Sequence, residues 1–316
     1  MTRKLGVVMD PIESISYQKD TTLALLLSAQ EAGYELYCME QQHLFIENCI
    51  PSALMCELQV FDNADKWFEK QQPKIKTLDY LDVILMRKDP PVDSEYIYST
   101  YILEAAEKKG CLVINCPRSL RDCNEKVFAT QFPECTPPNL VSRQKQQLKE
   151  FLSEYSDIVL KPLDGMGGKS IFRLQKNDPN TNVIIETLTQ DESKTIMAQK
   201  FLPEIVDGDK RILIVGGEVI PYCLARLPGD DDFRGNLAVG GKGIVQPLTA
   251  RDHWIASQVA STLFDKGLFF VGLDVIGEFL TEINVTSPTC VREIECATDL
   301  KIGNQLMSVI EEYGNN

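Results

Sequence analysis

Short apolar runs alternate with helical patterns through the first third of the chain. Residues 19–33 and 94–110 repeat apolar positions at helical spacing, and each pattern closes with a glycine. The apolar runs around these helices predict buried strands at residues 4–10, 34–40, 81–89 and 111–116. This alternation predicts a parallel sheet with crossover helices, an architecture in which ligands bind at the carboxyl ends of the strands.

Polar residues follow two of these strands. Met9-Asp10-Pro11 ends the first strand, and Met86-Arg87-Lys88-Asp89-Pro90-Pro91 ends the third. Proline stops each strand, and the polar side chains before it either face a ligand or serve an ordinary turn. Taken singly, each motif fits both interpretations equally well.

The pattern changes after residue 116. A helix is expected over residues 119–132 with Ser119 as its N-cap, and the prolines that follow indicate a boundary at residues 133–138. Strand and helix patterns from there to residue 202 predict one small α+β unit. Further on, a hairpin is expected to turn at Gly216-Gly217. Residues 227–243, rich in glycine and aspartate, are expected to form a lid that orders when substrates bind.

The small α+β unit contains the glycine-rich stretch KPLDGMGGKSIFRL, residues 161–174. Its GGKS sequence matches the end of a phosphate-binding P-loop. A P-loop also needs a glycine where Leu163 stands and a helix after Ser170, whereas IFRL is typical of a strand. The stretch is therefore interpreted as a glycine-rich turn between two strands, which could lie as a flap over a nucleotide.

Three oxygen-bearing side chains interrupt the apolar run FFVGLDVIGEFLTEINVTSP, residues 269–288. Glu282 and Asn284 are two residues apart and so share one face of a strand. If the loop comprises residues 277–279, Asp274 falls opposite Glu282, and the three groups offer the hard oxygen ligands that Mg²⁺ prefers. The alternative, polar residues on a half-solvated hairpin, stays open.

Basic residues lie next to the glycine turns and strand ends. Lys161 precedes the glycine-rich turn, and the other three are Arg211, Arg226 and Arg234. The planar fork of arginine suits phosphate or carboxylate. A single arginine in an acidic protein is, however, commonly a surface ion-pair residue.

The composition limits the kinds of molecule and the cellular setting that suit this chain. With 32 Lys+Arg against 46 Asp+Glu, the net charge of −14 disfavours nucleic acid and anionic membranes. The ten cysteines form no Cys-x-x-Cys pair, and we expect reduced, mostly buried thiols. His43 and His253 are the only histidines, so no histidine base is expected. Because we find neither a signal-peptide pattern nor a membrane span, we expect a cytoplasmic protein.

Together these features resemble the ATP-grasp enzymes, and among them the prokaryotic-type glutathione synthetases. The resemblance rests on stretches spread along nearly the whole chain: KLGVVMDPI, VILMRKDPP, SLRDCNEK, LKPLDGMGGKSIFR, DGDKRILIV, YCLARLP, RGNLAVGGKG, GLDVIG and TEINVTSPTCVREIE. It implies an α/β chain with an ATP-grasp fold, α+β in its ATP-binding part, and an N-terminal parallel-sheet domain. The implied division is an N-terminal substrate domain at 1–122, a small subdomain with the flap at 123–203, and a C-terminal subdomain with the metal site and lid at 204–316.

The resemblance also implies roles for single residues. Those implied for ATP are Lys126, Lys161, Gly165, Gly167, Gly168, Gln199, Leu202 and Asp209, with residues 197–202 beside the adenine. Those implied for the divalent metal, Mg²⁺ or alternatively Mn²⁺, are Asp274, Glu282 and Asn284. Those implied for the transferring phosphoryl group are Arg211, Arg226 and Arg234. Those implied for the peptide substrate are Asn236, Ser287 and Thr289.

The implied reaction joins γ-glutamylcysteine to glycine with ATP through an acyl phosphate, and it releases ADP and phosphate. The partners are then these small molecules, and the resemblance implies a homo-oligomer, a tetramer. Two other hypotheses stay open: another ATP-grasp carboxylate–amine ligase with a different acceptor, and a nucleotide-binding module without turnover. Three arginines and a full metal set disfavour the module, because a sensor needs no clamp for transition-state charge.

Overall fold

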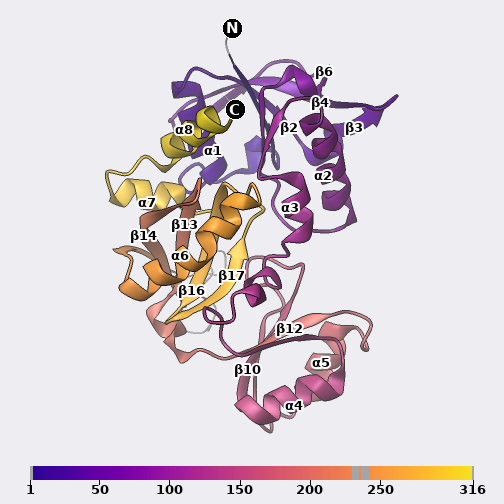
Figure 1. Cartoon of the computed structure of the whole chain (residues 1–316), viewed down its shortest axis with the longest axis vertical. Helices are drawn as coiled ribbons and strands as arrows, with labels where there is room; N and C mark the ends of the chain where they lie inside the picture. Colours follow the sequence, from indigo (N-terminus) through magenta and orange to yellow (C-terminus); the bar gives the residue numbers. More distant parts are fainter. Residues whose placement is uncertain (1–2, 230–234, 236–241, 315–316) are drawn as a thin grey trace.

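The computed structural model of the chain describes residues 3–229, 235 and 242–314. The predictions for Arg234, Asn236 and most of the expected lid at 227–243 concern residues outside this description. Figure 1 shows an elongated molecule with an N-terminal sheet at the top, a second sheet in the middle and a small sheet at the bottom.

The N-terminal sheet combines parallel and antiparallel strands. Its strands are β1 (Lys4–Val8), β2 (Glu35–Met39), β3 (Leu44–Glu47), β4 (Ile50–Val60), β5 (Phe68–Lys70), β6 (Lys74–Thr77), β7 (Val83–Met86) and β8 (Leu112–Ile114). Their order is β3-β4-β2-β1-β7-β8, with β5 and β6 paired to β4. The expected parallel arrangement is confirmed for β2-β1-β7-β8, while β3 to β6 add an antiparallel edge that the alternation did not predict.

Two helices connect these parallel strands as expected. They are α1 (Thr21–Glu31) and α2 (Ser94–Glu107). The Asp20 and Asp93 side chains cap them by accepting backbone N–H groups at 2.6 and 2.9 Å. The short 3₁₀ turns of this region are η1 (Ile12–Ser14), η2 (Gln41–His43) and η3 (Leu78–Tyr80).

The helix expected over residues 119–132 was wrong. The structure has a short helix α3 (Pro117–Asp122) and a 3₁₀ turn η4 (Phe128–Gln131), with irregular backbone between them. Ser119 is not an N-cap, because α3 begins at Pro117 and the Ser119 hydroxyl donates to the Lys266 carbonyl at 2.6 Å. The break has a local cause: the Asn124 side chain accepts the N–H groups of Lys126 and Val127, which is an Asx-type alternative to a helix.

The small sheet has its own hydrophobic core. Its elements are β9 (Asn139–Ser142), α4 (Lys145–Tyr155), β10 (Asp157–Pro162), β11 (Phe172–Gln175), α5 (Thr181–Thr189) and β12 (Ile196–Lys200). The strand order is β11-β10-β12-β9. Because β10 and β11 are antiparallel neighbours, the glycine-rich stretch between them is confirmed as a turn between two strands. The core under this sheet is made of residues 140–198 alone.

The middle sheet is antiparallel and five-stranded. Its strands are β13 (Asp209–Val215), β14 (Glu218–Leu227), β15 (Lys242–Pro247), β16 (Phe270–Ile276) and β17 (Phe279–Asn284), in the order β15-β14-β13-β16-β17. The turn η5 (Pro203–Asp207) leads into it, and the helices that follow are α6 (Ala250–Asp265), α7 (Val291–Ala297) and α8 (Ile302–Gly314). The hairpin turn at Gly216-Gly217 is confirmed, and both glycines have positive φ.

The β16–β17 hairpin pairs Asp274 with Glu282, as expected, but its loop is shorter than predicted and a bulge restores the pairing. The loop is two residues long, since Ile276 pairs with Phe279. A register shift follows, in which Thr281 is the extra residue of β17, and this bulge brings Glu282 opposite Asp274. The predicted loop at 277–279 was therefore wrong, while the predicted pairing is right.

The N-terminal sheet and the middle sheet share their cores. One core cluster contains Val8 and Ile84 from the first sheet together with Ile212 and Val271 from the second. The other joins Leu5 on β1 to α1, α7 and α8. Helix α8 packs directly against α1, and a Cβ added at Gly303 would lie 2.3 Å from the Ser28 hydroxyl. These two sheets therefore form one body, and the small sheet is the separate unit.

Candidate active site

One cavity of about 310 Å³ gathers the expected site residues. It is lined by all fifteen of them that the structure describes: Lys126, Lys161, Gly165, Gly167, Gly168, Gln199, Leu202, Asp209, Arg211, Arg226, Asp274, Glu282, Asn284, Ser287 and Thr289. Its walls come from the small sheet on one side and the middle sheet on the other. Neither His43 nor His253 belongs to this lining.

The middle sheet contributes two arginines that share the carboxylate of Asp274. Arg211 holds Asp274 with two hydrogen bonds, of 2.6 and 3.2 Å. Arg226 contacts Asp209 at 2.6 Å and Asp274 at 3.0 Å. All four residues lie on neighbouring strands, so strand pairing fixes their positions. Carboxylates of the protein thus orient both guanidinium groups.

Burial raises the pKa values of Asp209 and Asp274, whereas the neighbouring arginines lower them. Burial alone would raise the pKa of Asp274, but Arg211 and Arg226 hold it well below its usual range. For Asp209 burial prevails and raises the pKa to about 6, although Arg226 acts in the other direction. The Asp209 Oδ1 atom is buried and has no hydrogen-bond partner among the described residues. Asp209 is therefore the carboxylate of this group with a free acceptor for a ligand.

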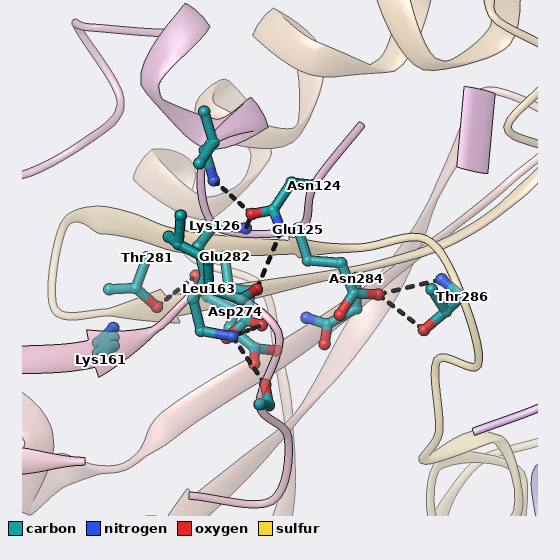
Figure 2. A network of polar contacts seen from close by, with 12 residues as sticks. Asn124, Glu125, Lys126, Lys161, Leu163, Asp274, Thr281, Glu282, Asn284 and Thr286 are labelled. Carbon is teal, nitrogen blue, oxygen red and sulfur yellow. Dashed lines mark hydrogen bonds and ion pairs between the residues drawn. The ribbon is translucent and has the colours of Figure 1, made fainter. Parts of the chain in front are cut away.

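Lys126 connects the glycine-rich turn to β17. Its ammonium donates to the Glu282 carboxylate at 2.9 Å and to the Gly165 carbonyl at 3.0 Å (Figure 2). Burial opposes the charge on Lys126, but Glu282 outweighs it and raises the lysine's pKa. The same side chain thus contacts the turn and a predicted metal ligand.

Lys161 lies on the opposite wall with a neutral partner. Its ammonium donates to the Gln199 side-chain oxygen at 2.6 Å, and the described residues offer it no ion-pair partner. Burial lowers the pKa of Lys161. A cation placed in this way gains most from an anionic ligand.

The glycine-rich turn needs its glycines for backbone conformation. Gly167 and Gly168 have φ of +63° and +76°, in the left-handed region. A Cβ at Gly167 would meet no atom within 4 Å, so the dihedral angle and not space requires glycine there. Lys169, which gave this stretch its likeness to a P-loop, is exposed at the cavity's edge.

The expected metal ligands present oxygen atoms to the cavity. Asp274 and Glu282 are carboxylates, and Asn284 donates its amide N–H to the Gly272 carbonyl at 3.2 Å, which leaves its own carbonyl oxygen for a ligand. Two carboxylates and an amide oxygen suit a hard divalent cation. Within residues 3–229, 235 and 242–314 no group of three or more His, Cys, Asp or Glu side chains is placed to hold a metal.

Two residues at or beside the cavity received no individual role from the sequence: Glu125, and Arg87, which the sequence indicated only as one of several polar residues at a strand end. Glu125 is buried and accepts the N–H groups of Val285 and Thr286 at 2.8 and 3.0 Å, so it fixes the segment that follows β17. Figure 2 shows its contact with Thr286. Arg87 is buried and donates to the Pro288 carbonyl at 2.9 Å. The position of Arg87 at the end of a strand was a sequence signal for a ligand contact. For Glu125 the sequence offered no signal apart from its place in the stretch SLRDCNEK.

The fold defines the class of protein. The structure superposes on the crystal structure of the D-cycloserine synthetase DcsG with a TM-score of 0.69 at 11% sequence identity. The superposition covers 98% of this chain and 99% of DcsG. Over 99% of each chain, the structure superposes on the ATP-grasp ligase PsnB complexed with minimal precursor with a TM-score of 0.63 at 16% identity. The fold is thus an ATP-grasp fold, as expected.

Sequence similarity then gives the family. The model for the prokaryotic glutathione synthetase N-terminal domain matches residues 3–121, and the model for the ATP-grasp domain of the same family matches residues 125–299. Glutathione synthetase of Pseudomonas aeruginosa is 59% identical over 310 residues, and that of Escherichia coli O6:H1 is 57% identical over 308, each covering 98% of both chains. The chain belongs to the prokaryotic glutathione synthetase family.

Family membership decides among the hypotheses left open by the sequence. The protein is an enzyme, an ATP-dependent ligase that synthesises glutathione. A ligase with another product and a module without turnover are both set aside. All ten cysteines are free and six are buried, as expected. Among the described helices, none has the length and apolar character needed to cross a membrane.

Proposed function

We propose that the cavity makes glutathione through an acyl phosphate. The cysteinyl carboxylate of γ-glutamylcysteine attacks the γ-phosphorus of ATP, and ADP leaves. The amine of glycine then attacks the carbonyl carbon of the acyl phosphate, phosphate leaves, and the amine loses a proton. The observation that carries this proposal is the gathering of cations and oxygen ligands around one cavity.

ATP lies between the two sheets in this proposal. Lys126 and Lys161 face its phosphates, and the glycine-rich turn covers them through Gly165, Gly167 and Gly168. Gln199 and Asp209 hold the nucleoside. Val159, Ile171, Leu202 and Ile205 line the same cavity, which suits the apolar faces of a purine. Lys161 supports this orientation, because its ammonium has no carboxylate partner among the residues that the structure describes and a phosphate would supply that negative charge.

The transferring phosphoryl group lies at the middle sheet. Arg211 and Arg226, with Arg234, stabilise the negative charge that develops during transfer, and the fixed orientation of the first two supports this role. Asp274, Glu282 and Asn284 would hold Mg²⁺, whose charge would help to neutralise the phosphate oxygens. Ser287, Thr289 and Asn236 hold the dipeptide; Thr289 accepts a hydrogen bond from Arg211 at 3.3 Å, which supports its closeness to the reacting end.

We further propose a role for each domain, a cellular compartment and an oligomeric state. Residues 1–122 bind substrate, 123–203 cover ATP, and 204–316 hold the metal and the lid. The ten free cysteines support a reducing compartment, the cytoplasm. The chain also forms a homo-oligomer, a tetramer, in this proposal. Exposed apolar side chains on β3, β4 and β6 (Ile46, Ile50 and Ile75) and on α2 (Tyr98 and Tyr101) support association between chains.

An ADP-release assay with a panel of amine acceptors tests the reaction. We expect ADP only when γ-glutamylcysteine and glycine are both present, and equal turnover with D-alanine would contradict the assignment of the acceptor. With glycine replaced by hydroxylamine, the acyl phosphate should be trapped as a hydroxamate of γ-glutamylcysteine. ADP release without any hydroxamate would contradict the proposed intermediate.

A further inference from the structure

Two of the free cysteines face each other across neighbouring strands of the N-terminal sheet. In the antiparallel pairing of β2 with β4 (Figure 1), Cys38 lies directly opposite Cys56. Directly opposite residues of an antiparallel pair point to the same face of the sheet, so the two thiol groups are neighbours. Among the strand pairings of residues 3–229, 235 and 242–314, this is the one that sets a cysteine against a cysteine.

The spacing of such a pair suits a disulfide bond. Opposite residues of antiparallel strands have Cα atoms about 4.5–5.5 Å apart, and disulfides span Cα separations of about 4.4–6.8 Å. The Cβ atoms of such a pair are about 4.5–5.5 Å apart, whereas a disulfide needs about 3.5–4.5 Å. A small approach of β2 to β4 is therefore enough to form the bond. The strain of that approach makes the bond easier to reduce than a structural disulfide.

The surroundings give the two thiols different reactivity. Cys56 is half-buried, whereas Cys38 is only 8% exposed. Burial and then the nearby Cys56 raise the pKa of Cys38 to about 12, although Lys70 on β5 acts in the other direction. Because a thiol reacts as an accessible thiolate, a reagent from solution meets Cys56 first. Cys38 is then placed to attack the modified Cys56 from within the sheet.

We propose that Cys38 and Cys56 form a redox-sensitive dithiol that reacts with disulfides of small thiols. Glutathione disulfide, the oxidised form of the product, belongs to this class. Such a site would link the state of the enzyme to the ratio of glutathione disulfide to glutathione. Disulfides of this kind in a reducing compartment are typically transient, which agrees with a pair that is reduced at rest.

The reaction consists of two thiol–disulfide exchanges. The Cys56 thiolate attacks one sulfur of glutathione disulfide, which forms a mixed disulfide on Cys56 and releases one glutathione. The Cys38 sulfur, on losing its proton, attacks the Cys56 sulfur, which forms the Cys38–Cys56 bond and releases a second glutathione. Two electrons pass from the protein dithiol to glutathione disulfide, and the two thiol protons balance those of the two released glutathione thiols. Excess glutathione reverses both steps.

Peptide mapping of the full-length wild-type protein tests the site. The protein, with all thiols reduced at the start, is incubated with excess glutathione disulfide. The remaining thiols are then alkylated, and the peptides are mapped by mass spectrometry without reduction. The peptides that contain Cys38 and Cys56 should be joined, with no glutathione left on either residue. Excess glutathione, added before alkylation, should separate them again.

Single substitutions separate the two steps. In Cys38→Ser, Cys56 should take up glutathione and keep it, because the second thiol that would displace it is missing. In Cys56→Ser, Cys38 should remain a free thiol over the time in which the wild type becomes fully bridged, because it is buried and protonated. A structural role of either residue would not produce this difference between the two variants.

Other cysteines of the same chain serve as matched controls. Cys49 and Cys296 are exposed, and no strand pairing sets a cysteine opposite either of them, so each should acquire glutathione and keep it until a reductant is added. Cys116 and Cys123 flank the two ends of α3. They are separated by roughly 10 Å along the helix axis, whereas a disulfide allows at most about 7 Å between Cα atoms. This second pair should stay unbridged.

Several outcomes would overturn the proposal. One is a stable mixed disulfide on Cys56 of the wild type, and another is no reaction of Cys56 under conditions that modify Cys49. A Cys38–Cys56 bond that excess glutathione does not reduce would be a structural disulfide and not a redox-sensitive one. If either serine variant does not fold, the mapping of wild type alone decides between a bridge and none. These measurements involve no turnover, so they do not depend on glutathione synthesis.

Discussion

The small sheet and the middle sheet form opposite walls of one cavity, yet they hold their charges in different ways. On the middle sheet, Arg211 and Arg226 share the carboxylate of Asp274, and the core beneath continues into the N-terminal sheet. On the small sheet, the one partner of Lys161 within the described part of the chain is the neutral amide of Gln199, and the core is the sheet's own. One wall is therefore complete before substrates arrive, whereas the other depends on ATP for its charge balance and can move without disrupting the larger core.

The largest expected effect comes from breaking the charge group of the middle sheet. Arg226→Met leaves Asp209 and part of Asp274 unpaired in a buried site, which should lower the free energy of unfolding by about 3–5 kcal/mol and abolish activity. Arg173→Met on the small sheet removes a more exposed pair with Asp157 and should cost about 1 kcal/mol or less. Urea unfolding compares the two variants. Equal losses would mean that the two walls do not differ in this way.

The next largest effect is expected on the rate of catalysis, with little change in the stability of the fold. Glu282→Gln and Asn284→Ala should each lower kcat by 10²- to 10³-fold, about 3–4 kcal/mol in the transition state, because both groups serve the reacting phosphates and metal. The melting temperature of the ligand-free protein should change little, since the glutamine oxygen still accepts from Lys126. A large loss of stability with normal turnover would make the hairpin residues structural.

A pair of core substitutions compares the two cores directly. Ile185→Ala in the small core and Ile212→Ala in the shared core should each cost about 3 kcal/mol locally. Amide hydrogen exchange should quicken only within residues 139–200 for Ile185→Ala, and in both larger sheets for Ile212→Ala. If Ile185→Ala also quickens exchange throughout the N-terminal sheet, the small sheet is not an independent unit.

The smallest effect on stability is expected at Lys161. Because the pKa of Lys161 is lowered in the folded state, keeping it charged at neutral pH costs folding free energy. Lys161→Met should therefore leave the ligand-free protein as stable or more stable, on the order of 1 kcal/mol or less, and the gain should vanish toward the ordinary lysine pKa of about 10.4.

Thermal shift measurements with ATP complete this test of Lys161. The stabilisation by ATP and Mg²⁺ should be largely lost in Lys161→Met and retained in Lys161→Arg, which keeps the charge. Full ATP stabilisation of Lys161→Met would show that Lys161 does not face the phosphates.

The sequence predicted local pattern better than it predicted three-dimensional contacts. Alternating strands and helices gave the parallel part of the first sheet, and the apolar hairpin gave the pairing of Asp274 with Glu282. The bulge at Thr281 left no signal, because one extra residue does not change an apolar pattern. The prediction of a helix over residues 119–132 failed because the side chain of Asn124 competes for backbone N–H groups. Arg87 and Glu125 acquire their roles from partners more than 150 positions away, which spacing alone does not reveal.

The contact of α8 with α1 has a consequence for protein synthesis. The core cluster that joins β1 to α1, α7 and α8 contains Leu5 from β1, Leu25 from α1, and Leu306 and Ile310 from α8. While the ribosome is still making the chain, β1 and α1 have left the exit tunnel but their last packing partner does not yet exist. The apolar face of α1 then stays open to solvent or to chaperones until α8 has been made. A nascent chain stalled before α8 should accordingly be far more sensitive to protease in its N-terminal sheet than in the small sheet, which is complete by residue 200.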